Sequence, residues 1–177
     1  MIDTIKNVLE GEDIRMDLRT IRYLLRREVK KIMLKLQYGK RINIGRKVGY
    51  RNNVRFYLER DAELVIGDRC FFNNDCSINV QKRVEIGENT LFGEGVKLYD
   101  HNHIFAEKDK PIFRQGFRIG EIHIGANCWI CSNCVILKGV HIGDNCVIGA
   151  GCIISEDVPD NTIVRCVQQL EMEARRQ

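Results

Sequence analysis

Hydrophobic residues return every six positions along most of this chain. A large aliphatic or aromatic side chain recurs at Ile66, Phe72, Ile78, Ile86, Phe92, Leu98, Ile124, Ile130, Ile136, Ile142, Ile148 and Ile154. A helix repeats its apolar face every 3.6 residues and a half-buried strand every two, so a period of six predicts neither an ordinary helix nor an up-and-down sheet. It is the period of a parallel β-helix, in which each short strand inserts one large side chain into a shared interior. We therefore predict a mainly β protein.

Five Ile-Gly phrases divide the repeats into coils. They begin at Ile44, Ile66, Ile86, Ile124 and Ile142, at separations of 22, 20, 38 and 18 residues. Three hexads make one three-sided coil of 18 residues, so we predict about five triangular coils over residues 42–163. The separation of 38 contains 20 extra residues, which predicts one long protruding loop at residues 99–121. A single interruption of an otherwise regular count is typical of a functional loop.

Residues 1–41 follow another pattern and are predicted to be a helical segment, with a break at Gly11. Apolar residues recur at three- and four-residue steps, at Ile14, Leu18, Ile21, Leu25, Val29, Ile32 and Leu36. Residues 14–41 also contain ten Lys or Arg against two acids. One interpretation packs the apolar face over the open end of the β-helix or against a neighbouring subunit. The other adds peripheral contact with an anionic membrane surface. Residues 164–177 are predicted to form a polar C-terminal tail.

The formal net charge of +4 belongs to this basic segment, and the repeats are close to neutral. We expect no nucleic-acid partner. The sequence shows no pattern of a signal peptide and no apolar run of about 18 residues, so a cytoplasmic protein is expected, with the inner face of the membrane as a further possibility. Six of the eight cysteines occupy the fifth place of a hexad, where they are predicted to be small buried fillers with reduced thiols: Cys70, Cys76, Cys128, Cys134, Cys146 and Cys152.

The predicted loop opens with Asp100-His101-Asn102-His103, and the coils resume at Asn127-Cys128-Trp129-Ile130. With these motifs, residues 40–163 resemble the hexapeptide-repeat acyltransferases. This family of left-handed parallel β-helices includes the galactoside and maltose acetyltransferases, and the likeness is greatest to the O-acetyltransferases of bacterial capsule and surface-polysaccharide pathways. The resemblance implies left-handed coils, a homotrimer with active sites at subunit interfaces, acetyl-coenzyme A (acetyl-CoA) as co-substrate and no metal.

The resemblance also implies roles for individual residues. A sugar hydroxyl is a poor nucleophile at neutral pH, and an imidazole can take its proton as it attacks the thioester. The implied base is His101, with His103 orienting it or contacting the acceptor. A buried backbone amide or the Trp129 indole could hold the developing oxyanion, and simple packing is the alternative role of Trp129. The implied cofactor-binding residues are Ser132, Ala150, Gly151 and Ser155, and the implied substrate-binding residues are Asn73, Asn74 and Asp100. Glu156 departs from the family, which commonly has lysine at this position next to the cofactor.

These features predict an acetyl-CoA-dependent O-acetyltransferase that modifies a sugar hydroxyl of a surface polysaccharide or its precursor. Two alternatives remain. Glu156 and the unusual sequence from Arg165 onward are compatible with a non-catalytic trimeric scaffold whose cofactor groove has degraded. A zinc protein similar to the γ-type carbonic anhydrases would use three histidines, for which His101, His103 and His123 are the candidates.

Overall fold

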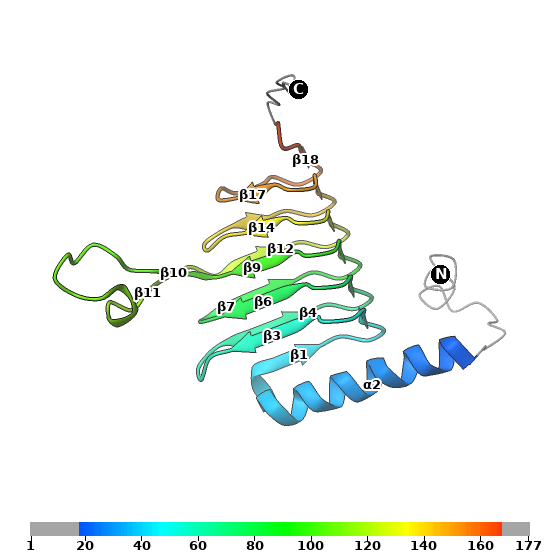
Figure 1. Ribbon diagram of the computed structural model, residues 1–177. Coiled ribbons are helices and arrows are strands. Elements are labelled where there is room, and N and C mark those ends of the chain that lie inside the picture. Colours follow the sequence, from blue (N-terminus) through cyan, green and yellow to red (C-terminus); the bar gives the residue numbers. More distant parts are fainter. Residues whose placement is uncertain (1–17, 168–177) are drawn as a thin grey trace, which may run out of the picture.

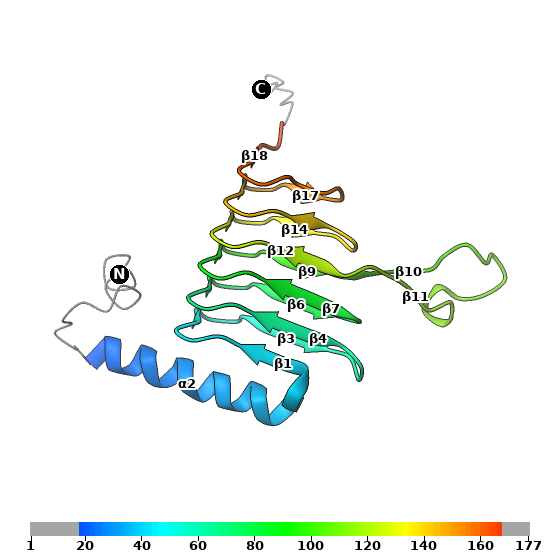
Figure 2. The same cartoon turned by 180° about the vertical axis from the view of Figure 1, so that it is seen from behind.

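The computed structural model describes residues 18–167 and shows a solenoid of parallel strands with a helix across one end (Figure 1). A two-stranded hairpin projects from its side, as the view from behind also shows (Figure 2). The solenoid has three faces, each a parallel sheet whose strands come from successive coils. The predicted mainly β, stacked-coil fold is confirmed.

The three sheets are named here A, B and C in the order in which the chain enters them. Sheet A contains β1 (Ile42–Ile44), β4 (Glu63–Ile66), β7 (Arg83–Ile86), β12 (Ile122–Ile124) and β15 (His141–Ile142). Sheet B contains β2 (Gly49–Tyr50), β5 (Phe71–Phe72), β8 (Leu91–Phe92), β13 (Trp129–Ile130), β16 (Val147–Ile148) and β18 (Ile163–Val164). Sheet C contains β3 (Arg55–Leu58), β6 (Ser77–Val80), β9 (Lys97–Tyr99), β14 (Val135–Ile136) and β17 (Ile153–Ile154). Five full coils result, and a sixth begins with the bridge of Val158 to Ile142 and continues into β18.

The hexad residues form three columns inside the solenoid. In sheet A the column is Ile44, Ile66, Ile86, Ile124 and Ile142, each paired in register with the next. Sheet B places aromatic rings in its lower coils, where Phe72 stacks on Phe92 with ring centroids 4.6 Å apart. All of the predicted hexad residues are buried. Burial of one large side chain per strand therefore sets the register of every coil.

Tight corners join the sheets and explain the cysteines. Cys70 is buried and its thiol lies 3.1 Å from the carbonyl oxygen of Gly87 in the next coil; Thr90, at the equivalent place one coil on, donates to the carbonyl of Gly125 at 2.9 Å. A small side chain with a donor fits this corner. The buried cysteines are thus fillers, as predicted, and most also contact a corner carbonyl.

Helix α2 (Leu18–Tyr38) and the short 3-10 helix η1 (Gly39–Arg41) lie across the first coil. This coil has no coil beneath it, so carbonyl groups at its edge lack strand partners. Side chains of the helical segment supply donors: Lys31 Nζ reaches Gly45 O at 2.8 Å, Tyr38 Oη reaches Phe56 O at 2.7 Å, and Lys30 donates to Val54 O. The helix therefore caps the open end with hydrogen-bond donors in addition to the buried Leu34 and Tyr38.

Helix α2 packs over the open end of the β-helix, which was one of the two expected positions, but its orientation differs from the expectation. The apolar face was expected to make this contact or one with a neighbouring subunit, yet Leu18, Leu25 and Leu36 are exposed in the single chain, while Leu34 and Tyr38 are buried. The physical reason is the row of edge carbonyls, which needs hydrogen-bond donors more than an apolar cover. The part of the predicted helical segment before Leu18 and the part of the C-terminal tail beyond Val167 lie outside the described residues.

Candidate active site

The long loop leaves the solenoid at the edge between sheets C and A, between β9 and β12. It begins and ends as an antiparallel pair, β10 (His101–His103) and β11 (Phe117–Ile119), in which His101 faces Ile119 and His103 faces Phe117. A short 3-10 helix, η2 (Ile112–Arg114), lies in the connection. Gln115 is buried, donates to the carbonyls of Glu107 and Lys110 and accepts from the Glu107 amide. The loop thus has its own internal hydrogen bonds.

Asp100 is fixed at the point where this hairpin starts. Its side chain has 0% exposure, and its two carboxylate oxygens accept hydrogen bonds from the backbone N–H groups of Gln81, Lys82 and Arg83 at 2.8–3.1 Å. These three residues form the corner between sheets C and A one coil below. The negative charge is therefore buried but surrounded by donors, which is the arrangement that allows a carboxylate to stay ionised away from water.

His101 completes this group. Its Nδ1 lies 2.9 Å from Asp100 Oδ1, and its ring stands edge-on to Phe117 with centroids 5.0 Å apart. Because an ionised carboxylate only accepts, this contact assigns the proton to Nδ1 and leaves the Nε2 lone pair available. The side chain keeps 18% of its surface exposed, so Nε2 belongs to a partly open, oriented imidazole. This is the geometry of a general base.

His103 is the second histidine of the motif and lies further out on β10, where it is exposed and its ring is 4.6 Å from Phe117. One of the two roles predicted for His103 was to orient His101. In the structure the contact that orients His101 comes from Asp100 instead. The predicted contact of Asp100 with an acceptor is corrected for the same reason: this side chain is wholly buried and all its hydrogen bonds are internal.

The other predicted site residues occupy different edges of the prism. Asn73, Asn74, Ser132, Ala150 and Gly151 follow strands of sheet B, so they line the edge between sheets B and C. Gly151 N donates to Ser132 O at 2.9 Å, so these two cofactor candidates are stacked in adjacent coils. Asn74 uses its side chain within the corner, where Oδ1 accepts from Asn52 N and Nδ2 donates to Glu94.

Ser155 does not join that group. It follows β17 and lies at the edge between sheets C and A, the edge at which the hairpin leaves two coils below. Within one chain, therefore, the width of sheet C separates the histidines and Ser155 from the other three cofactor candidates.

Trp129 lies on the outer face of sheet B and is 52% exposed. It belongs to a vertical row of outward apolar residues, paired in register from Phe71 through Leu91, Trp129 and Val147 to Ile163. The outer face of sheet A is different, because it presents Glu85, His123 and His141. Sheet B therefore carries an apolar row along its outer face.

The residues of the zinc alternative are dispersed. His123 lies on sheet A, with Nδ1 3.7 Å from Glu85 and Nε2 3.6 Å from Glu121, whereas His101 and His103 belong to the hairpin. Over residues 18–167, no three His, Cys, Asp or Glu side chains gather in a way that could hold a metal ion.

The fold and the repeat define the class of architecture: a solenoid of stacked parallel coils built on a six-residue repeat. Residues 121–156 match the family described as bacterial transferase hexapeptide (six repeats). Nodulation protein L of Rhizobium meliloti is 41% identical over 106 residues, which cover 59% of this chain and 56% of that protein. The chain thus spans little more than half the length of this curated relative.

Two solved structures share the fold. A maltose O-acetyltransferase from Clostridium difficile has a TM-score of 0.62 and 23% identity, over 96% of this chain and 98% of that one. A hexapeptide-repeat acetyltransferase from Vibrio cholerae, complexed with acetyl-CoA, has a TM-score of 0.62 and 22% identity, over 90% and 91% of the two chains.

Proposed function

We propose that the chain is an acetyl-CoA-dependent O-acetyltransferase in which His101 is the general base. The observation that carries the proposal is the Asp100–His101 pair, because a buried carboxylate fixes the tautomer and direction of an imidazole at the base of the projecting hairpin. The names of the two solved structures that share the fold, the maltose O-acetyltransferase and the Vibrio cholerae acetyltransferase, support acetyl transfer as the reaction class.

The chemistry follows from the free Nε2. The acceptor hydroxyl gives its proton to Nε2 while its oxygen attacks the thioester carbonyl, and the resulting imidazolium is stabilised by the Asp100 carboxylate. Collapse of the tetrahedral intermediate breaks the C–S bond, and the departing thiolate takes the proton from Nε2. The products are the O-acetyl ester and coenzyme A, and His101 returns to its starting state. We assign the oxyanion contact to the Trp129 indole or a backbone amide.

We propose that the active unit is a homotrimer whose sites form between subunits. In one chain the hairpin and the cofactor candidates Ser132, Ala150 and Gly151 lie at different edges, so a single copy does not bring them together. The apolar row on sheet B offers a surface for association, because five stacked apolar side chains point outward there. In such a trimer the hairpin of one subunit faces the cofactor edge of the next.

Complementation tests this arrangement. His101→Ala removes the base, and Ala150→Glu places a carboxylate at an exposed position of the cofactor edge, where it repels the phosphates of coenzyme A. If the two variants are unfolded and refolded together, random cyclic trimers pair an intact base with an intact groove at about a quarter of the sites. Return of about a quarter of wild-type activity supports shared sites, and an inactive mixture contradicts them.

We propose a sugar hydroxyl of a surface polysaccharide or its precursor as the acceptor, and the cytoplasm as the site of reaction. The acceptor class rests on the resemblance of the Asp100–His103 motif to that of the sugar acetyltransferases and on the name of the maltose O-acetyltransferase that shares the fold. The decisive experiment measures release of coenzyme A with a panel of sugars, amino sugars and glycans. His101→Ala should abolish turnover while the far-ultraviolet circular dichroism stays unchanged, and undiminished turnover would assign the base elsewhere. Absence of acetyl-CoA binding by calorimetry would favour the scaffold.

A further inference from the structure

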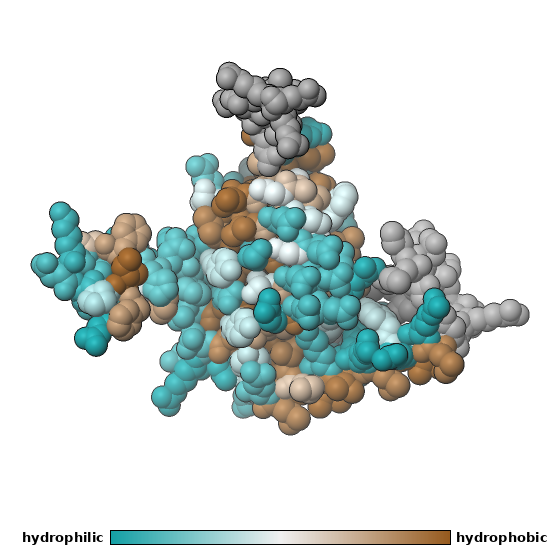
Figure 3. Space-filling view, in the orientation of Figure 1, coloured by the Kyte–Doolittle hydropathy of each residue, from teal (hydrophilic) through white to brown (hydrophobic). Residues whose placement is uncertain are grey.

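One face of α2 presents apolar side chains to the outside of the molecule. Leu18 and Leu36 are 85% and 81% exposed, and four apolar residues between them on this face are exposed as well. We call this the outer stripe, and its members are Leu18, Leu25, Val29, Ile32, Met33 and Leu36. In the space-filling view they form a brown band along the helix at the end of the molecule (Figure 3). Such a contiguous apolar band indicates a binding surface.

The outer stripe lies on the side of α2 opposite to the solenoid. Thr20, Leu34 and Tyr38 are buried, and at 3.6 residues per turn they share the other face of the helix. The stripe is therefore not needed to attach α2 to the first coil, since the buried face and the lysine bonds to edge carbonyls already do so. Part of it, from Leu18 to Met33, also lines a shallow groove along the helix.

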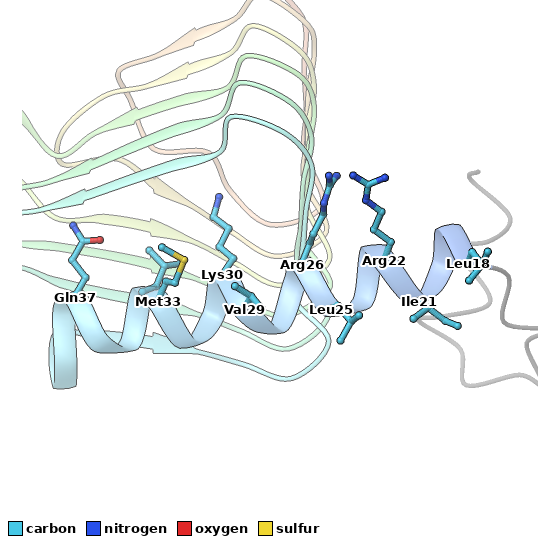
Figure 4. Close-up of a pocket in the computed structure, with 10 residues that line it drawn as sticks. Leu18, Ile21, Arg22, Leu25, Arg26, Val29, Lys30, Met33 and Gln37 are labelled. Carbon is cyan, nitrogen blue, oxygen red and sulfur yellow. The ribbon is translucent and has the colours of Figure 1, made fainter.

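Positive charge borders this apolar surface. Helix α2 contains seven Lys or Arg and a single acid, Glu28, which pairs with Arg27. Lys30 and Lys31 donate to the first coil, whereas Arg19, Arg22, Arg26 and Lys35 are exposed. In the close-up, Arg22, Arg26 and Lys30 extend on one side of the helix, while Ile21 and Leu25 point to the other (Figure 4).

We propose that the outer stripe of α2 docks onto an anionic lipid bilayer, with the helix lying flat in the interface. A helix of 21 residues is about 31 Å long, so its stripe can enter the acyl boundary along its whole length while exposed arginines contact lipid phosphates. In the described part of the chain no helix is long and apolar enough to cross a membrane, which leaves an in-plane arrangement. In this arrangement the first coil is the part of the solenoid nearest to the membrane.

A second copy of α2 fits less well. Each helix carries seven Lys or Arg and a single acid, so the like net charges of two copies oppose association. An anionic surface, by contrast, matches this charge.

Co-sedimentation of the full chain with vesicles tests the proposal. We expect binding to phosphatidylcholine vesicles in which about a third of the lipid is phosphatidylglycerol, weak binding to phosphatidylcholine alone, and loss of binding as salt is raised. Leu36→Gln should weaken binding about tenfold, and Leu25→Gln combined with Leu36→Gln about a hundredfold. Glutamine retains helix propensity, so α2 should persist.

Val167→Gln is the matched control, because Val167 is 90% exposed but follows β18, the strand at the end of the solenoid opposite to α2 (Figure 1). It should bind as wild type. Equal binding by the Leu25/Leu36 variant would overturn the proposal, as would binding that appears only after residues 1–17 are removed. Failure to bind anionic vesicles, together with self-association that the Leu25/Leu36 variant abolishes, would overturn it in favour of a second copy. Acetyl transfer to a soluble acceptor should be unchanged in these variants, so failure here is distinguishable from failure of the proposed activity.

Discussion

Asp100→Asn separates the orienting role of the carboxylate from its place in the fold. In the structure Oδ1 is the atom that contacts His101 Nδ1, and Oδ2 accepts from Gln81, Lys82 and Arg83. An asparagine that keeps its oxygen at the Oδ2 position retains those backbone bonds. Its amide nitrogen then replaces Oδ1 and donates to Nδ1, which moves the imidazole proton to Nε2. His101 would remain in place but could no longer accept a proton from the acceptor.

The magnitudes differ for catalysis and for stability. A positioned general base contributes about 10²- to 10⁴-fold to turnover, and the wrong tautomer should remove most of it. In Asp100→Asn neutral hydrogen bonds replace charge-assisted ones. A hydrogen bond to a charged group contributes about 1 kcal/mol more to the free energy of unfolding than a neutral bond does. With a donor–donor contact at Gln81 N added, we expect the free energy of unfolding to fall by about 1–3 kcal/mol. That loss leaves a folded protein in which activity can be measured.

The assay compares kcat and KM for wild type, Asp100→Asn and Asp144→Asn. Asp144 also uses its Oδ1 to accept a corner amide, that of Ala126 at 2.7 Å, but no histidine contact accompanies it. We expect kcat to fall in Asp100→Asn with little change in the KM of the acceptor, because Asp100 is buried and touches no substrate. A folded Asp100→Asn variant with kcat within about threefold of wild type would refute the tautomer argument. An equal loss in Asp144→Asn would attribute the effect to the coils instead.

Three further predictions concern the solenoid. In Gly87→Ala the new Cβ would lie 2.5 Å from the backbone nitrogen of Ala126 in the next coil, so urea unfolding should show a loss of about 3 kcal/mol. Gly139→Ala, where nothing lies within 4 Å and only a φ of +80° opposes the change, should lose about 1 kcal/mol, and equal losses would contradict coil contact as the cause. Hydrogen bonds from the Arg46 backbone and guanidinium lower the pKa of the Asp68 carboxyl, so its stabilisation is present above the unfolded pKa near 3.8 and is lost as pH falls through the lower folded value. Asp68→Asn should therefore flatten the acid side of the stability curve, most clearly at low salt, and an unchanged curve would be the contrary result. Burial raises the pKa of the Cys70 thiol to about 12, so iodoacetamide at about pH 8 should label the exposed Cys166 and spare Cys70 in peptide maps; labelling of native Cys70 would mean that the coils open.

The solenoid was predictable because its sequence signal is local and repeated. Each Ile of the Ile-Gly phrases must enter the interior once per coil, and the corner after it admits only a small residue, so the spacing alone gives the stacking of Ile66 on Ile86. The insertion between Leu98 and Ile124 was predictable for the same reason. It is the one place where the number of residues between successive Ile-Gly phrases exceeds one coil by more than the length of a further coil.

The orientation of α2 and the role of Asp100 were not predictable in this way. A hydrophobic period shows that a helix has an apolar face, but it does not show that the end of a β-helix offers carbonyls that attract Lys30 and Lys31 instead. Gln115, which holds the loop together, carried no periodic signal. These contacts join residues that are 5 to 24 positions apart in sequence, through polar groups that follow no repeat.

The position of the histidine is tied to the closure of the solenoid. Two coils below the hairpin, Glu59 N and Glu63 N donate to Val80 O and Lys82 O of the following coil. At the next corner this arrangement cannot continue, because the chain departs after Asp100 and returns only at Gly120. The Asp100 carboxylate replaces the missing carbonyls for Gln81, Lys82 and Arg83, while its own backbone oxygen accepts from Gly120 N at 2.8 Å. The Asp100 side chain thus satisfies the backbone donors of the coil at which the long loop begins. It also holds His101, the first residue of that loop, in one orientation. A loop inserted at this edge without an acidic residue at its start would leave buried donors unsatisfied, so the structural requirement of the fold also supplies the partner that a catalytic imidazole needs.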